Sequence, residues 1–543
     1  MIGLAHKTPD SGHWLQGRIF SGMRWTFWLA ALSVPFSLGT RVLLARTGPE
    51  ILGTFGLLGV YSSLASVFLY LGGDAVVMAF LPRLPDPEKR KFLTRYIGIV
   101  GLALAPWLLL ATLEPEWLHF VFGPGSDTRL ELALVWLAPV TIAYMLAIAA
   151  LKGTLEIAFA QALSRAVPIL SFLAYAGLWM WTPVWFRLHA QAAIWGTYLF
   201  LATVGAGIGL ARLRRLLPPA GVDVRLPAGF WSYTLSLQSN SILNFFANRF
   251  DLLLVLRAGG LSVLGEYVAL KSLSQTLRKS LQLLLDSLFP SLAHTWGVND
   301  LASTDAVLFR YIRMFYPMAL LSAAFVLCFA QPLLWMLGRP YLALIRILPW
   351  AVICASLQAC NALHGLLLNA SGHAQRALVA AALHAAIFIA SFWPFWHRWG
   401  FGGAIAAWGL GELVYYLASY FLLRNLRQVS ASAFGNPLLY FGLIGATALW
   451  TAHAGRISWQ QGTLLWMGNG GAYLVLAGYR GAELQQLIRL LLPGTRQPKE
   501  GKRRHDSKND LGADSDQKSA ARIAGDPGRP ASADARAGGG GGY

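Results

Sequence analysis

The chain has 543 residues, of which 56% are hydrophobic and only 13% are charged. Soluble domains carry about a quarter charged residues, so this composition excludes an ordinary soluble protein and predicts an integral membrane protein. The formal charge is +19, yet the polar tail at residues 494–543 contributes only +3, from ten basic and seven acidic residues. Most of the positive charge therefore lies among apolar segments, where it sets membrane topology rather than nucleic-acid binding.

The first 24 residues show no removable signal peptide, because no basic-then-apolar run in them ends at a small-residue cleavage site. Beyond them, windows of about 20 apolar residues predict fourteen membrane-spanning helices. The predicted helices begin near Trp25, Ile51, Phe92, Leu130, Ile157, Ala190, Phe230, Leu261, Phe309, Leu342, Gln375, Gly402, Pro437 and Gly462. The expected fold class is an all-α polytopic membrane protein.

The fourteen helices are expected to form two six-helix lobes followed by a final pair. The predicted segments are a cytoplasmic stretch at 1–24, an N-lobe at 25–211, a basic linker at 212–229, a C-lobe at 230–424, helices 13 and 14 at 425–480, and a mostly disordered cytoplasmic tail at 481–543. Loops on one side of the membrane carry nineteen Lys and Arg residues, and loops on the other side carry nine. The positive-inside rule therefore predicts that both termini lie in the cytoplasm.

No stretch of the sequence has the spacing of a metal site, a phosphate-binding GxxxxGK[ST] loop or a nucleophile elbow. Cys328, Cys354 and Cys360 all fall in apolar spans, which is typical of inert buried thiols rather than of a disulfide framework. We therefore expect neither an enzyme nor a cofactor.

Two stretches about 210 residues apart match each other. Residues 46–55 (RTGPEILGTF) open the second predicted span, and residues 257–267 (RAGGLSVLGEY) open the eighth; these spans end at Pro82 and Pro290. The offset covers six helices, an even number, so both copies point the same way. Parallel repeats of this kind occur in transporters whose substrate path lies between the two halves. The alternative is that both stretches are ordinary interfacial turns.

The eighth span carries two cations and two amides: Lys271, Gln275, Arg278 and Gln282. Their offsets of 0, 4, 7 and 11 residues place them on one helix face. A charge at mid-membrane costs at least ~2.5–3.5 kcal/mol, so such residues face a cavity or a partner. These side chains are candidates for holding a phosphate or pyrophosphate and sugar hydroxyls. We expect no comparable mid-span cation in the N-lobe.

The seventh span carries a polar stripe that includes Asn240 and Asn244, and we expect it to pair with the eighth span as a hairpin. Both asparagines are further candidates for binding substrate. The alternative for the basic stripe is that Lys271 merely pairs with Asp251 or Glu412, while Arg278 extends to the inner surface.

Four residues are candidates for gating or coupling. Asp251 lies near the outer end of the seventh span, where we expect a gate or a packing salt bridge with Arg46 or Arg257. Asp74 follows two glycines near the inner end of the second span, where it is a candidate for binding a coupling cation. A pairing of Asp74 with Arg83 is the alternative. His364, His384 and Glu412 are expected to be satisfied interior residues rather than a proton relay.

Three features of the sequence point to one family: the Leu-Gly-x-aromatic motif that opens spans two and eight, the Asn248-Arg249-Phe250-Asp251 run, and Pro290 at the end of span eight. In these three features the sequence resembles the polysaccharide (oligosaccharide-lipid) flippase family. That family belongs to the exporter superfamily that also contains multidrug/toxin extruders and peptidoglycan-precursor flippases. The resemblance covers residues 20–480. It implies a flippase in a bacterial plasma (inner) membrane that moves a polyprenyl-diphosphate-linked oligosaccharide from the cytoplasmic to the outer leaflet by alternating access.

The partners that the resemblance implies are a lipid-linked anionic oligosaccharide, the membrane lipids and a coupling ion, H⁺ or Na⁺. One alternative is a cation-coupled multidrug/toxin exporter, although lipophilic cations favour acidic cavities rather than a basic stripe. A second alternative is a membrane polysaccharide polymerase or ligase. Such an enzyme needs a catalytic loop outside the membrane, and no predicted loop between helices is long enough.

Overall fold

The computed structural model describes residues 32–113, 128–154, 156–217, 226–227, 229–275, 301–371, 373–424, 436–454 and 458–478, with the single residues 29, 281 and 285. These residues belong to one compact unit, Met1–Tyr479. The expected tail at 481–543 falls in a second unit, Arg480–Tyr543, and lies outside the described residues.

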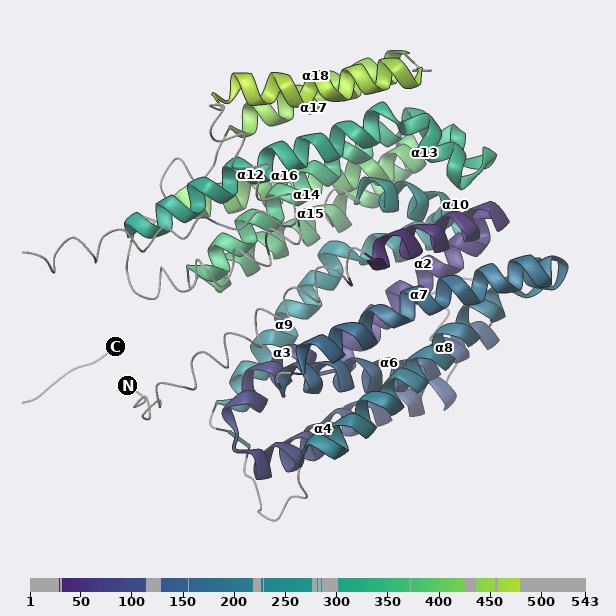
Figure 1. The fold of residues 1–543 in the computed structure, drawn as a ribbon, viewed down its shortest axis with the longest axis vertical. Coiled ribbons are helices and arrows are strands. Elements are labelled where there is room, and N and C mark those ends of the chain that lie inside the picture. Colours follow the sequence, from purple (N-terminus) through teal and green to yellow (C-terminus); the bar gives the residue numbers. More distant parts are fainter. Residues whose placement is uncertain are drawn as a thin grey trace, which may run out of the picture. The chain divides into compact units, whose positions relative to one another are not determined.

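Every regular element in the described residues is helical (Figure 1). After a first helix over residues 32–47, the N-terminal half contains α2 (Pro49–Leu69), α3 (Gly73–Phe80), η1 (Leu81–Arg83), α4 (Asp86–Leu113), α6 (Thr128–Gly153), α7 (Ile157–Trp181) and α8 (Pro183–Leu216). The remainder contains α9 (Phe230–Asn248), α10 (Phe250–Ser274), α12 (Leu301–Cys328), α13 (Ala330–Leu337), η2 (Arg339–Arg346), α14 (Leu348–Ala370), α15 (Ala374–Trp399), α16 (Phe401–Arg424), α17 (Pro437–Ala454) and α18 (Trp459–Leu476).

All fourteen predicted spans correspond to helices in these ranges, and nine helical segments there are long and apolar enough to cross a bilayer. The predicted fold class, an all-α polytopic membrane protein, is therefore confirmed. The ninth span begins at Leu301 rather than near Phe309, and the tenth begins at Leu348 rather than near Leu342. Gly338, at a φ of +130°, follows the end of α13, and the separate 3-10 helix η2 then begins at Arg339, with Pro340 in its first turn.

The helices before and after the middle of the chain pack mainly among themselves. In the first group α6 contacts α3 and α8, and α7 packs on α8; in the second, α16 contacts α14 and α15, and α12 contacts α17 and α18. One buried apolar cluster belongs to the first group apart from Phe230 of α9, and it includes Tyr70, Tyr96 and Leu151. A larger cluster fills the second group and extends to Leu52 on α2.

The seventh and eighth spans form a hairpin, as the sequence predicts. Within α10, Gly260 alone leaves the helical conformation, with a φ of +76° that glycine tolerates because it has no Cβ. Asp251 lies before this point and Lys271 after it, and the two side chains are in contact. The chain therefore reverses direction at Gly260.

The two copies of the sequence repeat pack against each other where α2 meets α10. A Cβ on Gly53 would clash with the carbonyl oxygen of Leu261, and one on Gly265 would clash with the carbonyl oxygen of Pro49. The two backbones thus approach as closely as only glycine permits. Because Gly53 and Gly265 are equivalent positions of the repeat, this contact places the parallel repeat at the boundary between the lobes.

A Gly265→Ala substitution is expected to destabilise the protein by about 1–3 kcal/mol, because the added methyl forces α2 and α10 apart. The thermal unfolding midpoint of the purified protein measures this effect. Gly442→Ala on α17 is the matched control, since a Cβ there meets nothing within 4 Å. Equal midpoints for the two variants would show that the helices do not approach each other in this way.

Candidate functional site

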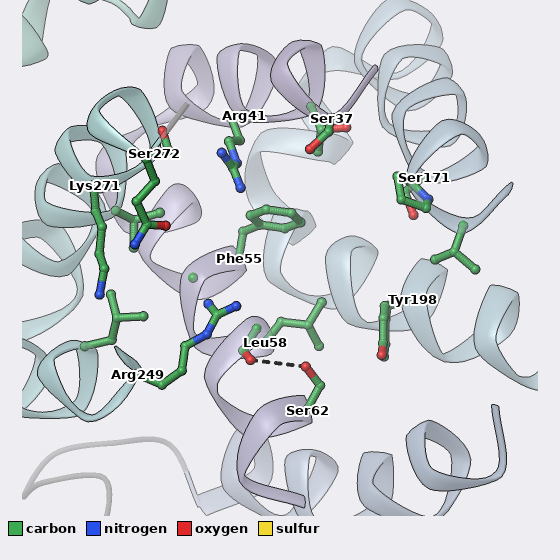
Figure 2. Close-up of a pocket in the computed structure, with 18 residues that line it drawn as sticks. Ser37, Arg41, Phe55, Leu58, Ser62, Ser171, Tyr198, Arg249, Lys271 and Ser272 are labelled. Carbon is green, nitrogen blue, oxygen red and sulfur yellow. Dashed lines mark hydrogen bonds between the residues drawn. The ribbon is translucent and has the colours of Figure 1, made fainter. Parts of the chain in front are cut away.

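A cavity of about 300 Å³ lies between the first helix, α2, α7, α8 and the α10 hairpin (Figure 2). It therefore takes its walls from both copies of the repeat. Its polar lining consists of Ser37, Thr40, Arg41, Ser62, Ser171, Tyr198, Arg249, Lys271, Ser272 and Gln275. The described lining contains three cationic side chains and no carboxylate, so the cavity has the electrostatic character of an anion site.

Arg41 and Arg249 reach into this cavity from opposite walls. Figure 2 shows the two guanidinium groups pointing toward one another on either side of Phe55. Their charges repel each other. Among the described residues, neither arginine forms an ion pair with a carboxylate. An anion bound between them would relieve this repulsion, because each guanidinium presents a fork of N–H donors.

The local backbone explains how Arg249 reaches the cavity. Arg249 leaves the helical conformation, with a φ of −131°, and separates α9 from α10. Gly59 on α2 lies opposite, and a Cβ there would come within 3.9 Å of the Arg249 Nη1 atom. The side chain therefore extends from the C-lobe to the part of α2 in the N-lobe where Gly59 has no side chain.

Lys271 also lines the cavity, but its charge is compensated. Its Nζ atom forms an ion pair with Asp251, and both side chains are less than a tenth exposed. The same Nζ donates to the Asn248 carbonyl oxygen at 3.1 Å. The Tyr267 hydroxyl donates to Asp251 Oδ2 at 2.7 Å. The alternative in which Lys271 pairs with Asp251 is thus the one observed, and the excess charge of the cavity comes from the arginines.

Glu412 on α16 is a buried carboxylate held by amides and an indole. Gln358 Nε2 donates to it at 2.9 Å, Asn361 Nδ2 at 2.7 Å and Trp408 Nε1 at 3.0 Å. Gln358 Nε2 also donates to Asn248 Oδ1 at 3.2 Å, which joins this network to the residues around Lys271. The expectation that Glu412 is a satisfied interior residue agrees with these contacts.

The other predicted substrate residues have different placements. Gln275 lines the cavity at the end of α10. Asn244 is exposed on α9 and is not among the lining residues. Asn240 belongs to α9 and Asp74 to α3, but their side chains lie outside the description, as do Arg278 and Gln282 entirely.

The expected salt bridge between Asp251 and Arg46 or Arg257 is wrong. Asp251 is already paired with Lys271, which the hairpin brings directly opposite. Arg46 instead donates from Nε to the Met336 carbonyl oxygen at 3.0 Å. Arg46 therefore links the end of the first helix to α13. Arg257 is an exposed residue of α10.

The described cavity lining includes a cation from the N-lobe, Arg41, where the sequence predicts no mid-span cation comparable to Lys271. Arg41 counts as a loop residue when spans are assigned by apolar windows, but the first helix continues through residue 47. Its spacing from Ser37, one helical turn earlier, was the available signal, since both residues line the cavity. The only sequence signal that included Arg249 was the Asn248-Arg249-Phe250-Asp251 run, which resembles the flippase family. Its place in the cavity could not be predicted, because it depends on the break between α9 and α10.

A second contact between the lobes lies further along α2. The helix breaks after Leu69, where Leu71, Gly72 and Gly73 all have positive φ. Gln238 of α9 spans this break: its Oε1 accepts from the Gly72 N–H at 2.8 Å, and its Nε2 donates to the Val67 carbonyl oxygen. Gly53 precedes the cavity-lining part of α2 and Gly72 follows it, so the lobes contact each other on both sides of the cavity.

Replacing Gln238 with Leu is expected to loosen this contact, because two hydrogen bonds worth about 1 kcal/mol each are lost. A cysteine introduced by Ser62→Cys, in a background lacking the three native cysteines, reports cavity access through its rate of maleimide labelling. We expect Gln238→Leu to raise that rate roughly 5- to 30-fold. Ser239→Ala is the control, since its hydroxyl bonds only within its own helix to the Leu235 carbonyl oxygen. An unchanged rate would rule out Gln238 as a closing contact.

The described helices form two groups around a basic cavity. No protein-family model and no curated protein sequence matches the chain. Solved structures do match. An inward-facing multidrug resistance MATE family transporter of the MOP superfamily gives a TM-score of 0.57 at 12% identity, covering 74% of this chain and 97% of its own.

The lipid II flippase MurJ, in an inward closed conformation, gives a TM-score of 0.60 at 12% identity, covering 85% of this chain and 99% of its own. A MOP superfamily transporter from Pyrococcus furiosus, described as having a binding pocket of reverse polarity, gives 0.51 at 12% identity, covering 75% and 93%. The chain therefore has the fold of the MATE and MurJ transporters.

Proposed function

We propose that this protein is a flippase that moves a polyprenyl-diphosphate-linked oligosaccharide from the cytoplasmic to the outer leaflet by alternating access. The observation that carries the proposal is the pair of guanidinium groups, Arg41 and Arg249, facing each other across a cavity whose described lining has no carboxylate. A diphosphate offers oxygen acceptors on two adjacent phosphates, so each arginine can take one phosphate through paired N–H donors.

The rest of the cavity suits the sugar next to the diphosphate. Hydroxyl groups of Ser37, Ser171 and Tyr198 line it, and hydroxyls both donate to and accept from sugar hydroxyls. A volume of about 300 Å³ is at the lower end of small-molecule sites. The cavity therefore accommodates the diphosphate and an adjoining sugar, while the polyprenyl chain stays in the bilayer. The presence of a lipid flippase among the matching structures supports a lipid as the transported substrate.

The membrane potential supplies a driving force for the outward transport of such an anionic lipid. Moving a negative head group outward across a membrane whose inside is negative releases ~2.3 kcal/mol per charge per 100 mV. A coupling ion, H⁺ or Na⁺, would add to this force.

The likeness to a multidrug resistance MATE transporter supports a second candidate, a cation-coupled exporter of small toxic molecules. The two repelling arginines would then favour anionic over cationic compounds. A cellular experiment separates the candidates. We expect cells that lack the protein to accumulate lipid-linked oligosaccharides and to lose surface polysaccharide. Intact surface polysaccharide together with raised sensitivity to toxic compounds would support the exporter instead.

A further inference from the structure

A second cavity, of about 290 Å³, lies on the N-lobe away from the central site. Its walls come from α4, α6 and α8, and both outer helices pack on α6, so the cavity opens between α4 and α8. None of its lining residues belongs to the central cavity. It is therefore a separate feature that the transport path does not use.

The cavity combines an apolar floor with a basic rim. Leu146, Ala150 and Leu213 on the floor are all at most 5% exposed. Arg90 and Arg214 provide the rim, one from the first turns of α4 and the other from the last turn of α8. Among the described residues, neither arginine forms an ion pair with a carboxylate. This combination matches an amphipathic ligand whose polar end is anionic.

The position of the cavity in the membrane indicates what that ligand is. The apolar segments Pro87–Leu109 and Pro183–Leu216 are both long enough to span a bilayer, so Arg90 and Arg214 lie at span ends, at the level of lipid headgroups. Below Arg90 on α4, Ile97 is 44% exposed and also lines the cavity. Basic pockets between membrane helices at this depth bind anionic lipid headgroups.

We propose that this cavity binds one anionic phospholipid of the surrounding bilayer. The two guanidinium groups hold the headgroup phosphate, and an acyl chain runs along Ile97 and Leu210 between α4 and α8. Charge complementarity at the rim and an apolar floor facing the lipid phase favour a lipid over a free phosphate. The bound lipid fills the space between two helices that both pack on α6.

The test measures lipid binding to the purified full-length protein by native mass spectrometry. The probes are phosphatidylglycerol and phosphatidylcholine with identical acyl chains, with free glycerol phosphate as a competitor. We compare wild type, the double variant Arg90→Gln/Arg214→Gln and the control Arg215→Gln, an exposed arginine next to the cavity that does not line it. The charge-conserving double variant Arg90→Lys/Arg214→Lys keeps the proposal testable if the glutamine variant is unstable.

We expect wild type and Arg215→Gln to bind phosphatidylglycerol roughly 10- to 30-fold more tightly than Arg90→Gln/Arg214→Gln does. Phosphatidylglycerol should also raise the unfolding midpoint of wild type, of Arg215→Gln and of the double lysine variant, but not of the double glutamine variant. Equal binding by the glutamine variant, or equal binding of phosphatidylcholine, would overturn the proposal. Effective competition by free glycerol phosphate would also overturn it, because the site would then recognise phosphate alone.

Discussion

The double variant Arg41→Gln/Arg249→Gln is expected to lose transport of a diphosphate-linked substrate by at least about 100-fold. Hydrogen bonds to charged groups contribute about 1.5–3 kcal/mol each, so each single substitution alone should cost roughly 10- to 150-fold. The matched control is Arg398→Gln, since Arg398 lies in the last turn of α15 with its guanidinium over the Trp399 ring, away from the cavity.

The thermal stability of the same variants separates substrate binding from a structural role. Because the positive charges of Arg41 and Arg249 repel each other, removing one charge should leave the unfolding midpoint unchanged or raise it. Arg249→Lys keeps the charge but loses the guanidinium fork, so it should retain intermediate transport. A fall in the unfolding midpoint that parallels the loss of transport would show that the arginines stabilise the fold rather than bind the substrate.

The largest stability effect is expected for Asp251→Ala, which should lower the free energy of unfolding by about 3–5 kcal/mol. This substitution leaves the Lys271 ammonium buried without its carboxylate, and its other contacts, the Asn248 carbonyl and the rings of Tyr267 and Trp408, do not replace that charge. Thermal or denaturant unfolding of the purified protein measures the loss.

The double variant Asp251→Leu/Lys271→Met provides the control for that prediction. Because it removes both charges together, it should recover most of the stability lost by Asp251→Ala, and a double-mutant cycle gives the coupling between the two residues. If Asp251→Ala unfolds at the wild-type midpoint, the pair is not buried as the structure shows. If the double variant is no more stable than Asp251→Ala, the loss arises from packing rather than from an unpaired charge.

The fourteen helices could be predicted because each rests on a local signal, a run of about 20 apolar residues. The hairpin of spans seven and eight was predictable for a similar reason, since Gly260 marks the turn and the two polar stripes adjoin in sequence. The repeat motif also placed Gly53 and Gly265 at equivalent positions. What the sequence did not reveal is that these two glycines contact each other across the lobe boundary.

The candidate site was only partly predictable because it is assembled from distant segments. Lys271 and Gln275 line the cavity as expected, but the cation that Lys271 contributes is neutralised by Asp251, a partner set by the hairpin. Arg41 looked like a loop charge, and its role depends on facing Arg249 from the other lobe. A helix-face pattern shows which side of a helix is polar, but it does not show which residue of another helix lies opposite.

The two contacts on α2 are the ones that the proposed alternating access would open in turn. At one side of the cavity Gly53 meets α10, and at the other Gln238 of α9 crosses the break after Leu69. Opening the cavity to one side of the membrane requires only one of these contacts to separate. The glycine contact is a close backbone packing, whereas the Gln238 contact is two hydrogen bonds, so we expect the Gln238 side to open at lower energetic cost.

In the proposed function, the arginine pair binds the diphosphate of an anionic lipid while that lipid crosses the membrane. The purified protein is reconstituted in liposomes with a fluorescent polyprenyl-diphosphate oligosaccharide. The measurement is the fraction of this lipid that reaches the opposite leaflet. We predict transbilayer movement with wild type and Arg398→Gln, and none above the protein-free rate with Arg41→Gln/Arg249→Gln. Movement that persists without both arginines, or no movement with correctly folded wild-type protein, would contradict the proposed function.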